Sequence, residues 1–231
     1  MRKHYYLVLD VETANSTDDA LVYDLGFAVA DRSGKIYETH SYINSDIFTH
    51  EKNLMTSAYY AHKIPEYLES IRKGEREVAN LYAIRQKVLD VFKRYPIRAV
   101  CAYNAGFDYK ALNTTQRYIT KSKYRYFLPY GVEVFDIWHM ACQTICSLNK
   151  YYKFCIDNGF VSASGNISTS AETVYRFLTN TPTFVEEHKG LEDVLIEVAI
   201  MTECYKKHQK MKRNIYRACW RIPQRKEKKA E

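Results

Sequence analysis

Two carboxylates stand at the end of an apolar stretch near the start of the chain. Residues 5–13 read Tyr-Tyr-Leu-Val-Leu-Asp-Val-Glu-Thr, a run of strand-forming residues without Gly or Pro, which predicts a buried strand. Because side chains alternate along a strand, Asp10 and Glu12 point one way and Val11 the other. Two acids in such a place repel each other and lose hydration, and a divalent cation between them would offset that cost. The pair alone also fits a strand that runs out into solvent with two exposed acids.

A second polar group, Asn104-x-x-x-Asp108, lies where a strand-type run gives way to a helix. The strand is expected over residues 97–103 and the helix over 109–118. Open α/β sheets bind their ligands at this kind of junction, so Asp108 would be aimed at whatever lies over the strand ends. An acid in a first helical turn also has a simpler explanation, because it offsets the helix dipole.

A third group, His188 and Asp193, lies at the start of the last long helix. Five helical steps turn the chain by about 500°, so the two side chains cannot share a face within one regular helix. They can converge if His188 lies on the preceding loop and Asp193 on the first turns, and Gly190 suits such a junction. A histidine near a helix start can equally be an ordinary surface residue.

The elements that must position these groups predict a mixed α/β domain. Further strands are expected over 21–31, 35–43 and 132–135, and helices over 46–73 (irregular, interrupted at Pro65), 77–94, 136–148, 150–157, 190–212 and from a capping box at 169–172 to 178. The first three strands have short links, which favours an antiparallel meander. Helical crossovers place the later strands parallel to the first one.

Length and charge predict one domain followed by a basic end. We expect a domain over residues 1–212 and a flexible tail over 213–231. Residues 206–229 contain eleven basic residues and one acid, a charge of +10, whereas the whole chain carries +7. The rest therefore sums to −3, and the basic segment either meets a polyanion or only solubilises the chain.

The lack of a recognisable targeting signal and the scattered cysteines lead us to expect a cytoplasmic protein. The apolar run before Asp10 has five residues, which is too short for a signal peptide or a membrane span, and no later segment reaches spanning length. The six cysteines are scattered, and without a secretion signal we expect reduced thiols.

The three polar groups, in this order, resemble the motifs of a known enzyme group. They look like the three exonuclease motifs of the DEDDh 3′–5′ exonucleases, which are DnaQ-like enzymes of the ribonuclease-H-like fold. Their residues here are Asp10-x-Glu12-Thr13, Asn104-x-x-x-Asp108 with Ala105-Gly106-Phe107 inside it, and His188-x-x-x-x-Asp193. The motifs span residues 5–200.

Three features depart from that pattern or extend it. Asn15 stands where the family often has Gly, and the segment 44–75 and the basic tail are unfamiliar. Within that segment, Ala61-His62-Lys63-Ile64 faintly resembles a His-Gly-Ile element of the family.

The resemblance implies a mechanism with two Mg²⁺ or Mn²⁺ ions held by the four carboxylates. Asp10 would bridge both ions, Glu12 and Asp193 would complete the first site, and Asp108 would help to hold the second. His188 would take the proton from the attacking water. By the same resemblance, the substrate-side residues are Thr13, Asn104 and Phe107.

Two further groups have simpler interpretations. His139, Cys142 and Cys146 share one helix face and could bind zinc, but a core stripe is the better interpretation. The basic and aromatic residues over 117–130 could track a single strand, yet ordinary packing explains them too.

The sequence thus predicts a metal-dependent 3′–5′ exonuclease acting on single-stranded or frayed DNA ends and releasing nucleoside 5′-monophosphates. The same catalysis on RNA stays open, as do a proofreading role beside a replication or repair protein and a non-catalytic nucleic-acid binder. A binder would gain nothing from four repelling acids, which favours the enzyme.

Overall fold

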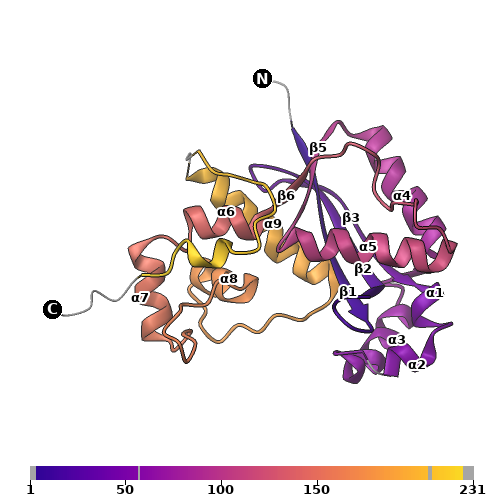
Figure 1. The fold of residues 1–231 in the computed structure, drawn as a ribbon, viewed down its shortest axis with the longest axis horizontal. Coiled ribbons are helices and arrows are strands. Elements are labelled where there is room, and N and C mark those ends of the chain that lie inside the picture. The colour runs from indigo at the N-terminus through magenta and orange to yellow at the C-terminus, as the bar shows by residue number, and fades with distance from the viewer. Residues whose placement is uncertain (1–3, 57, 208–209, 226–231) are drawn as a thin grey trace.

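A six-stranded sheet forms the centre of the protein (Figure 1). The structure is a computed structural model that describes residues 4–56, 58–207 and 210–225. The strands are β1 (Tyr5–Ala14), β2 (Leu21–Asp31), β3 (Ile36–Asn44), β4 (Glu77–Ala79), β5 (Ile97–Ala102) and β6 (Val134–Asp136), in the spatial order β4-β3-β2-β1-β5-β6. β2 is antiparallel to both β1 and β3, whereas β5 is parallel to β1 and β6 is parallel to β5. The predicted mixed sheet is confirmed.

Helices cover both faces of the sheet (Figure 1). They are α1 (Ser45–Phe48), α2 (Lys52–Thr56), α3 (Ile64–Arg72), α4 (Leu81–Arg94), α5 (Ala105–Thr120), α6 (Ile137–Thr144), α7 (Asn149–Asp157), α8 (Ala171–Thr179) and α9 (Gly190–Lys206), with short 3₁₀ turns η1 (Ala61–Lys63) and η2 (Cys219–Arg221). One core lies between the sheet and α4 and α5, and a second lies between the sheet and α6 to α9.

The alternation predicted for β1 separates these two cores. Tyr6 and Val8 pack in the core of α9, while Leu7 and Leu9 pack in the core of α5. Asp10 continues the first series and therefore emerges on the side of α9, as the strand period requires.

A third, smaller core lies beneath the segment that was unfamiliar in the sequence. Tyr23, Ile43, Ile47 and Tyr67 bring together β2, β3, α1 and α3. Pro65 lies in the first turn of α3 rather than at an interruption, a position where its missing N–H costs nothing. We call residues 45–76 the insert segment.

Two expected helices are shorter than predicted. The helix expected over 77–94 begins only at Leu81, because Glu77–Ala79 pair with β3 as the edge strand β4. The helix expected over 136–148 ends at Thr144, where Ile145 and Cys146 both donate to the Ala141 carbonyl in a tight turn. The residue that caps α8 also differs from the prediction. The side chain of Ser170, rather than that of Thr169, accepts a hydrogen bond from the Thr173 N–H.

The C-terminal prediction is wrong in two respects. The helix expected to reach residue 212 ends at Lys206, and the segment expected to be a flexible tail packs on the domain as far as Arg225. The Asp136 N–H donates to the Arg213 carbonyl at 2.7 Å, and Cys219 is fully buried. These anchors have no periodicity that the sequence could reveal. We call residues 210–225 the C-terminal strap; residues 226–231 lie outside the described part of the chain.

The cysteines are free and buried, as expected of reduced thiols. His139 is used in a hydrogen bond rather than by a metal: its Nδ1 donates to the Asn214 carbonyl at 2.8 Å, and Cys142 and Cys146 are buried like it. Within the described ranges, no helix is both long enough and apolar enough to cross a membrane.

Candidate active site

Buried carboxylates converge at the end of β1. Asp10 is half-buried, and its Oδ2 atom is shielded from solvent without a hydrogen-bond partner in the described part of the chain. Burial raises the pKa of Asp10 well above its ordinary value, and the charges of Glu197, Asp108, Glu12 and Asp193 raise it further. Asp10 therefore lies close enough to four other acids for their charges to act on its carboxyl.

Asp108 reaches this cluster because the chain turns sharply after β5. Asn104 adopts a left-handed conformation (φ 64°), so that α5 begins at once with Ala105. Asp108 lies in the first turn, is only 3% exposed, and accepts a hydrogen bond from the Val11 N–H between the two acids of β1. Burial raises the pKa of Asp108 to about 8.

The start of α9 is pressed directly against β2. A Cβ atom on Gly190 would lie 2.5 Å from the Gly26 nitrogen, so any side chain there would push the helix away from the sheet. Gly26 is the register partner of Asp10, and the Gly190 N–H donates to Asp24 Oδ2 at 3.0 Å. This contact brings the first turn of α9, with Asp193, over the end of β1.

Asp193 and His188 do converge, with His188 on the loop before the helix. His188 has a left-handed backbone (φ 49°). Asp193 is 4% exposed; its Oδ2 accepts from the Lys189 N–H at 3.2 Å, and its buried Oδ1 has no partner among the described residues. Burial and the nearby acids Glu186 and Glu12 raise the pKa of Asp193 to about 9.

The donor set fits a divalent cation. Glu12, His188 and Asp193 each offer one ligand atom, and these atoms all lie within 4.8 Å of one another. Asp10 and Asp108 lie outside this group, but the charges of Asp108, Glu12 and Asp193 act on Asp10, and its buried Oδ2 has no hydrogen-bond partner among the described residues. Oxygen-rich sites of this kind suit hard cations such as Mg²⁺ or Mn²⁺, and a bound cation would remove the repulsion that raises these pKa values.

His188 is held by residues of the insert segment. Its ring stacks on Tyr60, with centroids 4.6 Å apart and planes 16° apart. The Lys63 ammonium lies 5.1 Å from the centre of the Tyr60 ring and donates to the Glu187 carbonyl. Burial and the Lys63 charge lower the pKa of His188, which favours the neutral imidazole at neutral pH.

Glu197 is a fifth acid of this cluster that sequence reasoning missed. It lies four residues after Asp193 on α9, is 2% exposed, and accepts from the Tyr103 N–H at 2.9 Å. Its Oε2 is buried without a partner in the described ranges. The i, i+4 spacing on a predicted helix could have revealed it, because residues four apart share a face.

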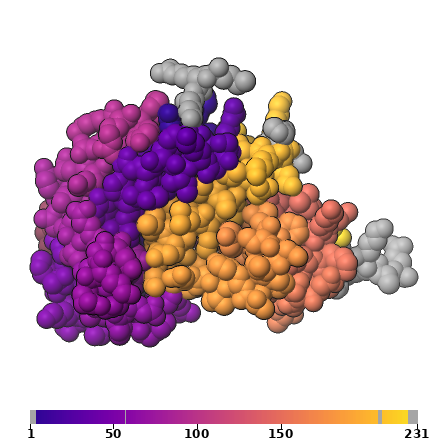
Figure 2. Space-filling model, turned by 180° about the vertical axis from the view of Figure 1, so that it is seen from behind, coloured from indigo at the N-terminus to yellow at the C-terminus, as the bar shows by residue number. Residues whose placement is uncertain are grey.

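A buried ion network, also missed, ties the insert segment to α9. Arg76 is 5% exposed; its guanidinium contacts Asp24 at 3.4 Å and both oxygens of Glu192 at 2.7 Å, and the Tyr67 hydroxyl donates to Asp24 at 2.9 Å. Glu192 precedes Asp193, so the network fixes the first turn of α9. Figure 2 shows the purple insert segment meeting the orange residues of α8 and α9.

The remaining predicted residues lie at the margin of the cluster. Thr13 follows a bulge in β1 and is half-buried, and Phe107 packs partly exposed on the core of α4 and α5. Asn104 is exposed, and its N–H donates to Asp136 Oδ1 at 3.2 Å. Asn15 has a left-handed backbone (φ 71°), a conformation that Gly adopts readily, and its side-chain amide donates to the Asp19 carbonyl at 3.0 Å.

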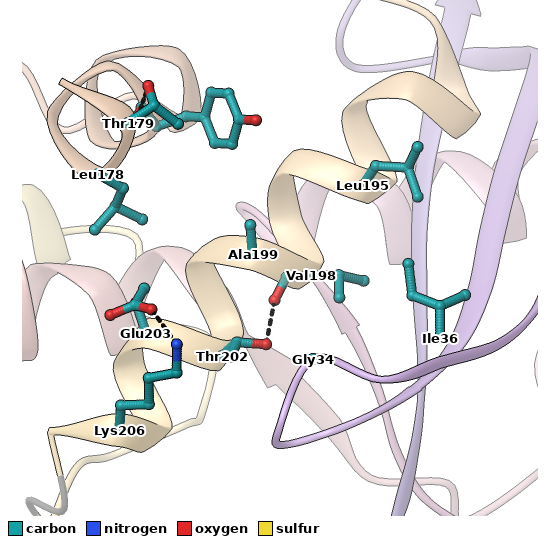
Figure 3. A pocket seen from close by; sticks show the side chains of 11 residues that line it. Gly34, Ile36, Leu178, Thr179, Leu195, Val198, Ala199, Thr202, Glu203 and Lys206 are labelled. Atoms are coloured by element: carbon teal, nitrogen blue, oxygen red, sulfur yellow. Dashed lines mark hydrogen bonds and ion pairs between the residues drawn. The ribbon is translucent and has the colours of Figure 1, made fainter. Parts of the chain in front are cut away.

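A groove elsewhere on the molecule has no comparable chemistry. It has a volume of about 530 Å³ and lies between α8, α9 and the turn after β2 (Figure 3). Its lining includes Ile36, Leu178 and Leu195, and its acid Glu203 is paired with Lys206 at 2.6 Å. The acids at the end of β1 remain the candidate active site.

Solved structures with this fold are exonucleases. E. coli exonuclease I in complex with a 5cy-dT13 oligonucleotide matches with a TM-score of 0.53 and 13% identity over 90% of this chain and 41% of that one. Exonuclease I from Methylocaldum szegediense matches with a TM-score of 0.55 and 16% identity over 88% of this chain and 40% of that one. The fold is therefore the ribonuclease-H-like α/β fold that these exonucleases also have.

These likenesses concern the fold, and the chain spans about two fifths of the length of the exonuclease I chains. No family model matches the sequence, and no curated protein matches it.

Proposed function

We propose that this protein is a two-metal-ion 3′–5′ exonuclease of the DEDDh type. It would remove nucleoside 5′-monophosphates from single-stranded or frayed DNA ends. The observation that carries the proposal is the group of Glu12, His188 and Asp193, whose ligand atoms lie within 4.8 Å of one another, with Asp10 and Asp108 close by, on a fold that solved exonucleases share. One of those exonuclease structures is a complex with a 5cy-dT13 oligonucleotide, and this likeness supports DNA as the substrate.

The four carboxylates would hold the cations. Asp10, whose carboxyl is acted on by the charges of the other acids, would bind both ions; Glu12 and Asp193 would complete one site, and Asp108 would help to hold the other. Bound there, the ions would supply an activated water and stabilise the leaving 3′ oxygen.

His188 would act as the general base. A ring nitrogen lies within 4.8 Å of oxygens of Glu12 and Asp193, close enough to take the proton from an attacking water held by these acids. Its lowered pKa keeps the imidazole neutral and able to accept a proton near pH 7. Stacking on Tyr60 limits the orientations of the ring.

The margin of the site would bind the terminal nucleotide. Thr13, Asn104 and Phe107 lie beside the carboxylates on β1 and α5 and offer hydroxyl, amide and ring contacts. Lys63, between Tyr60 and the loop of His188, would offer its ammonium to the phosphate.

Cleavage of matched DNA and RNA oligonucleotides tests the proposal. We expect 3′-tailed DNA to be shortened one nucleotide at a time in Mg²⁺ or Mn²⁺, with no cleavage in EDTA. Products with 5′-phosphates would be resolved chromatographically. Full activity in EDTA would contradict the metal mechanism, and faster cleavage of the RNA would reassign the substrate.

A further inference from the structure

The C-terminal strap carries positive charge that no acid within the described ranges neutralises by an ion pair. Residues 210–225 contain six basic residues and no acid. Five of them are exposed: Lys210, Lys212, Arg217, Arg221 and Arg225. No ion pair joins any of these five to an acid of the described chain, and Arg225 instead bonds Asn149 and stacks on Tyr152.

The strap is a built part of the surface rather than a loose tail. The Gln143 side chain bonds the backbone of Lys212 at both its N–H and its carbonyl, and Gln224 bonds the backbone of Ile167 in the same way. The Arg213 guanidinium lies over the rings of Phe135 and Tyr205. The packing therefore fixes the backbone from which these cations project, and like charges gathered along one segment cost free energy unless a polyanion meets them.

The strap passes beside the candidate active site. The Cγ2 atom of Ile215 lies 3.1 Å from the place that a Cβ atom on Gly106 would take, two residues before Asp108. Figure 1 shows the yellow strap running from β6 past the start of α5 and on toward α7. Lys212 and Arg217 are exposed and lie three residues before and two residues after Ile215, so the strap carries cations close in sequence to this contact.

We propose that the strap binds the phosphates of the single strand that leads into the active site. This inference rests on the proposed function and extends it to the strand beyond the terminal nucleotide. Exposed Lys and Arg residues bind phosphates regardless of base, so the strap would raise affinity without sequence preference. Because phosphate contacts do not involve the 2′-hydroxyl, the strap would hold DNA and RNA alike.

The test is the salt dependence of binding for Lys212→Gln/Arg217→Gln. Lys212 is anchored through its backbone, so its side chain can be changed without loss of the Gln143 contacts. The matched control is Lys73→Gln/Lys93→Gln, which removes the same charge from exposed residues paired with acids on their own helices, Glu69 and Asp90.

Binding of a fluorescent 20-nucleotide oligo(dT) would be followed by anisotropy in EDTA over a range of salt concentrations, so that no cleavage is needed. The slope of log K against log [salt] changes by about 0.7 for each phosphate contact on a single strand. We expect the slope of the strap variant to be shallower than that of the parent by roughly 1.4, because two phosphate contacts are removed. The slope of the control should equal that of the parent. Equal slopes for the strap variant and the control would overturn the proposal.

The cleavage assay in Mg²⁺ is scored separately. Cleavage with equal slopes would overturn the strap proposal and leave the proposed function standing. A strap-dependent slope without any cleavage would overturn the proposed function and leave a strap that binds single strands.

Discussion

Glu12→Gln should stabilise the metal-free protein at alkaline pH, although Glu12 is a proposed metal ligand. The pKa of Glu12 is raised from 4.5 to about 8. Burial is the largest cause of this shift, and the charge of Asp24 is the second. A carboxyl with a raised pKa binds its proton more tightly in the folded state. Its contribution to the free energy of unfolding is therefore fully present below about pH 4.5 and is lost as the pH rises through 8. Gln has no proton to lose and escapes this loss.

The size of the effect follows from the shift. One pKa unit corresponds to about 1.4 kcal/mol, so a shift from 4.5 to about 8 sets a ceiling on the order of 5 kcal/mol above pH 8. In a chain of this length 1 kcal/mol moves the melting temperature by about 2–4 °C. We expect Glu12→Gln to melt at least about 5 °C above the parent at pH 9 in EDTA, and close to it at pH 5.

Thermal unfolding in EDTA at pH 5, 7 and 9 measures this difference. Glu75→Gln, an exposed acid at the end of the insert segment, is the matched control and should follow the parent at every pH. Adding Mg²⁺ at pH 9 should stabilise the parent more than Glu12→Gln, because the parent keeps the ligand. A melting difference that does not grow between pH 5 and pH 9 would refute the reasoning.

Four other variants test separate parts of the site. Asp10→Ala should release no nucleotides in Mg²⁺ while melting no lower than the parent in EDTA; loss of fold would instead give Asp10 a structural role. His188→Ala should lower the single-turnover rate by about 10²–10⁴-fold with little change in the affinity for the oligonucleotide. A rate within a few-fold of the parent at every pH would show that His188 is not the general base. Arg76→Met should lower the free energy of unfolding by about 3–5 kcal/mol, because it leaves a buried aspartate unpaired. Arg76→Lys should recover only part of the loss and exposed Arg72→Met should lose almost none, so an Arg76→Met variant as stable as the parent would count against the network. Tyr60→Ala should remove burial from His188 and raise its pKa, so the rate should fall more at pH 6 than at pH 8; an unchanged pH profile would show that the stacking does not tune the base.

Local patterns in the sequence determined the sheet and the order of the polar groups. Alternation in β1 was enough to put Asp10 and Glu12 on one side, because a strand has a period of two. The strand-to-helix junction before α5 placed Asp108 at a helix start, and the loop-to-helix junction at Gly190 placed Asp193 at another. The three-strand meander and the parallel later strands followed from the lengths of the links.

Contacts between distant parts of the chain were decided only by the tertiary structure. The Gly190 N–H reaches Asp24 across 166 residues, and Arg76 joins the insert segment to Glu192 across 116. Tyr60 behind His188 and the strap beside Gly106 likewise have no local signature. Such contacts depend on which surfaces meet once the sheet has formed, and a window of sequence describes only one of the two surfaces.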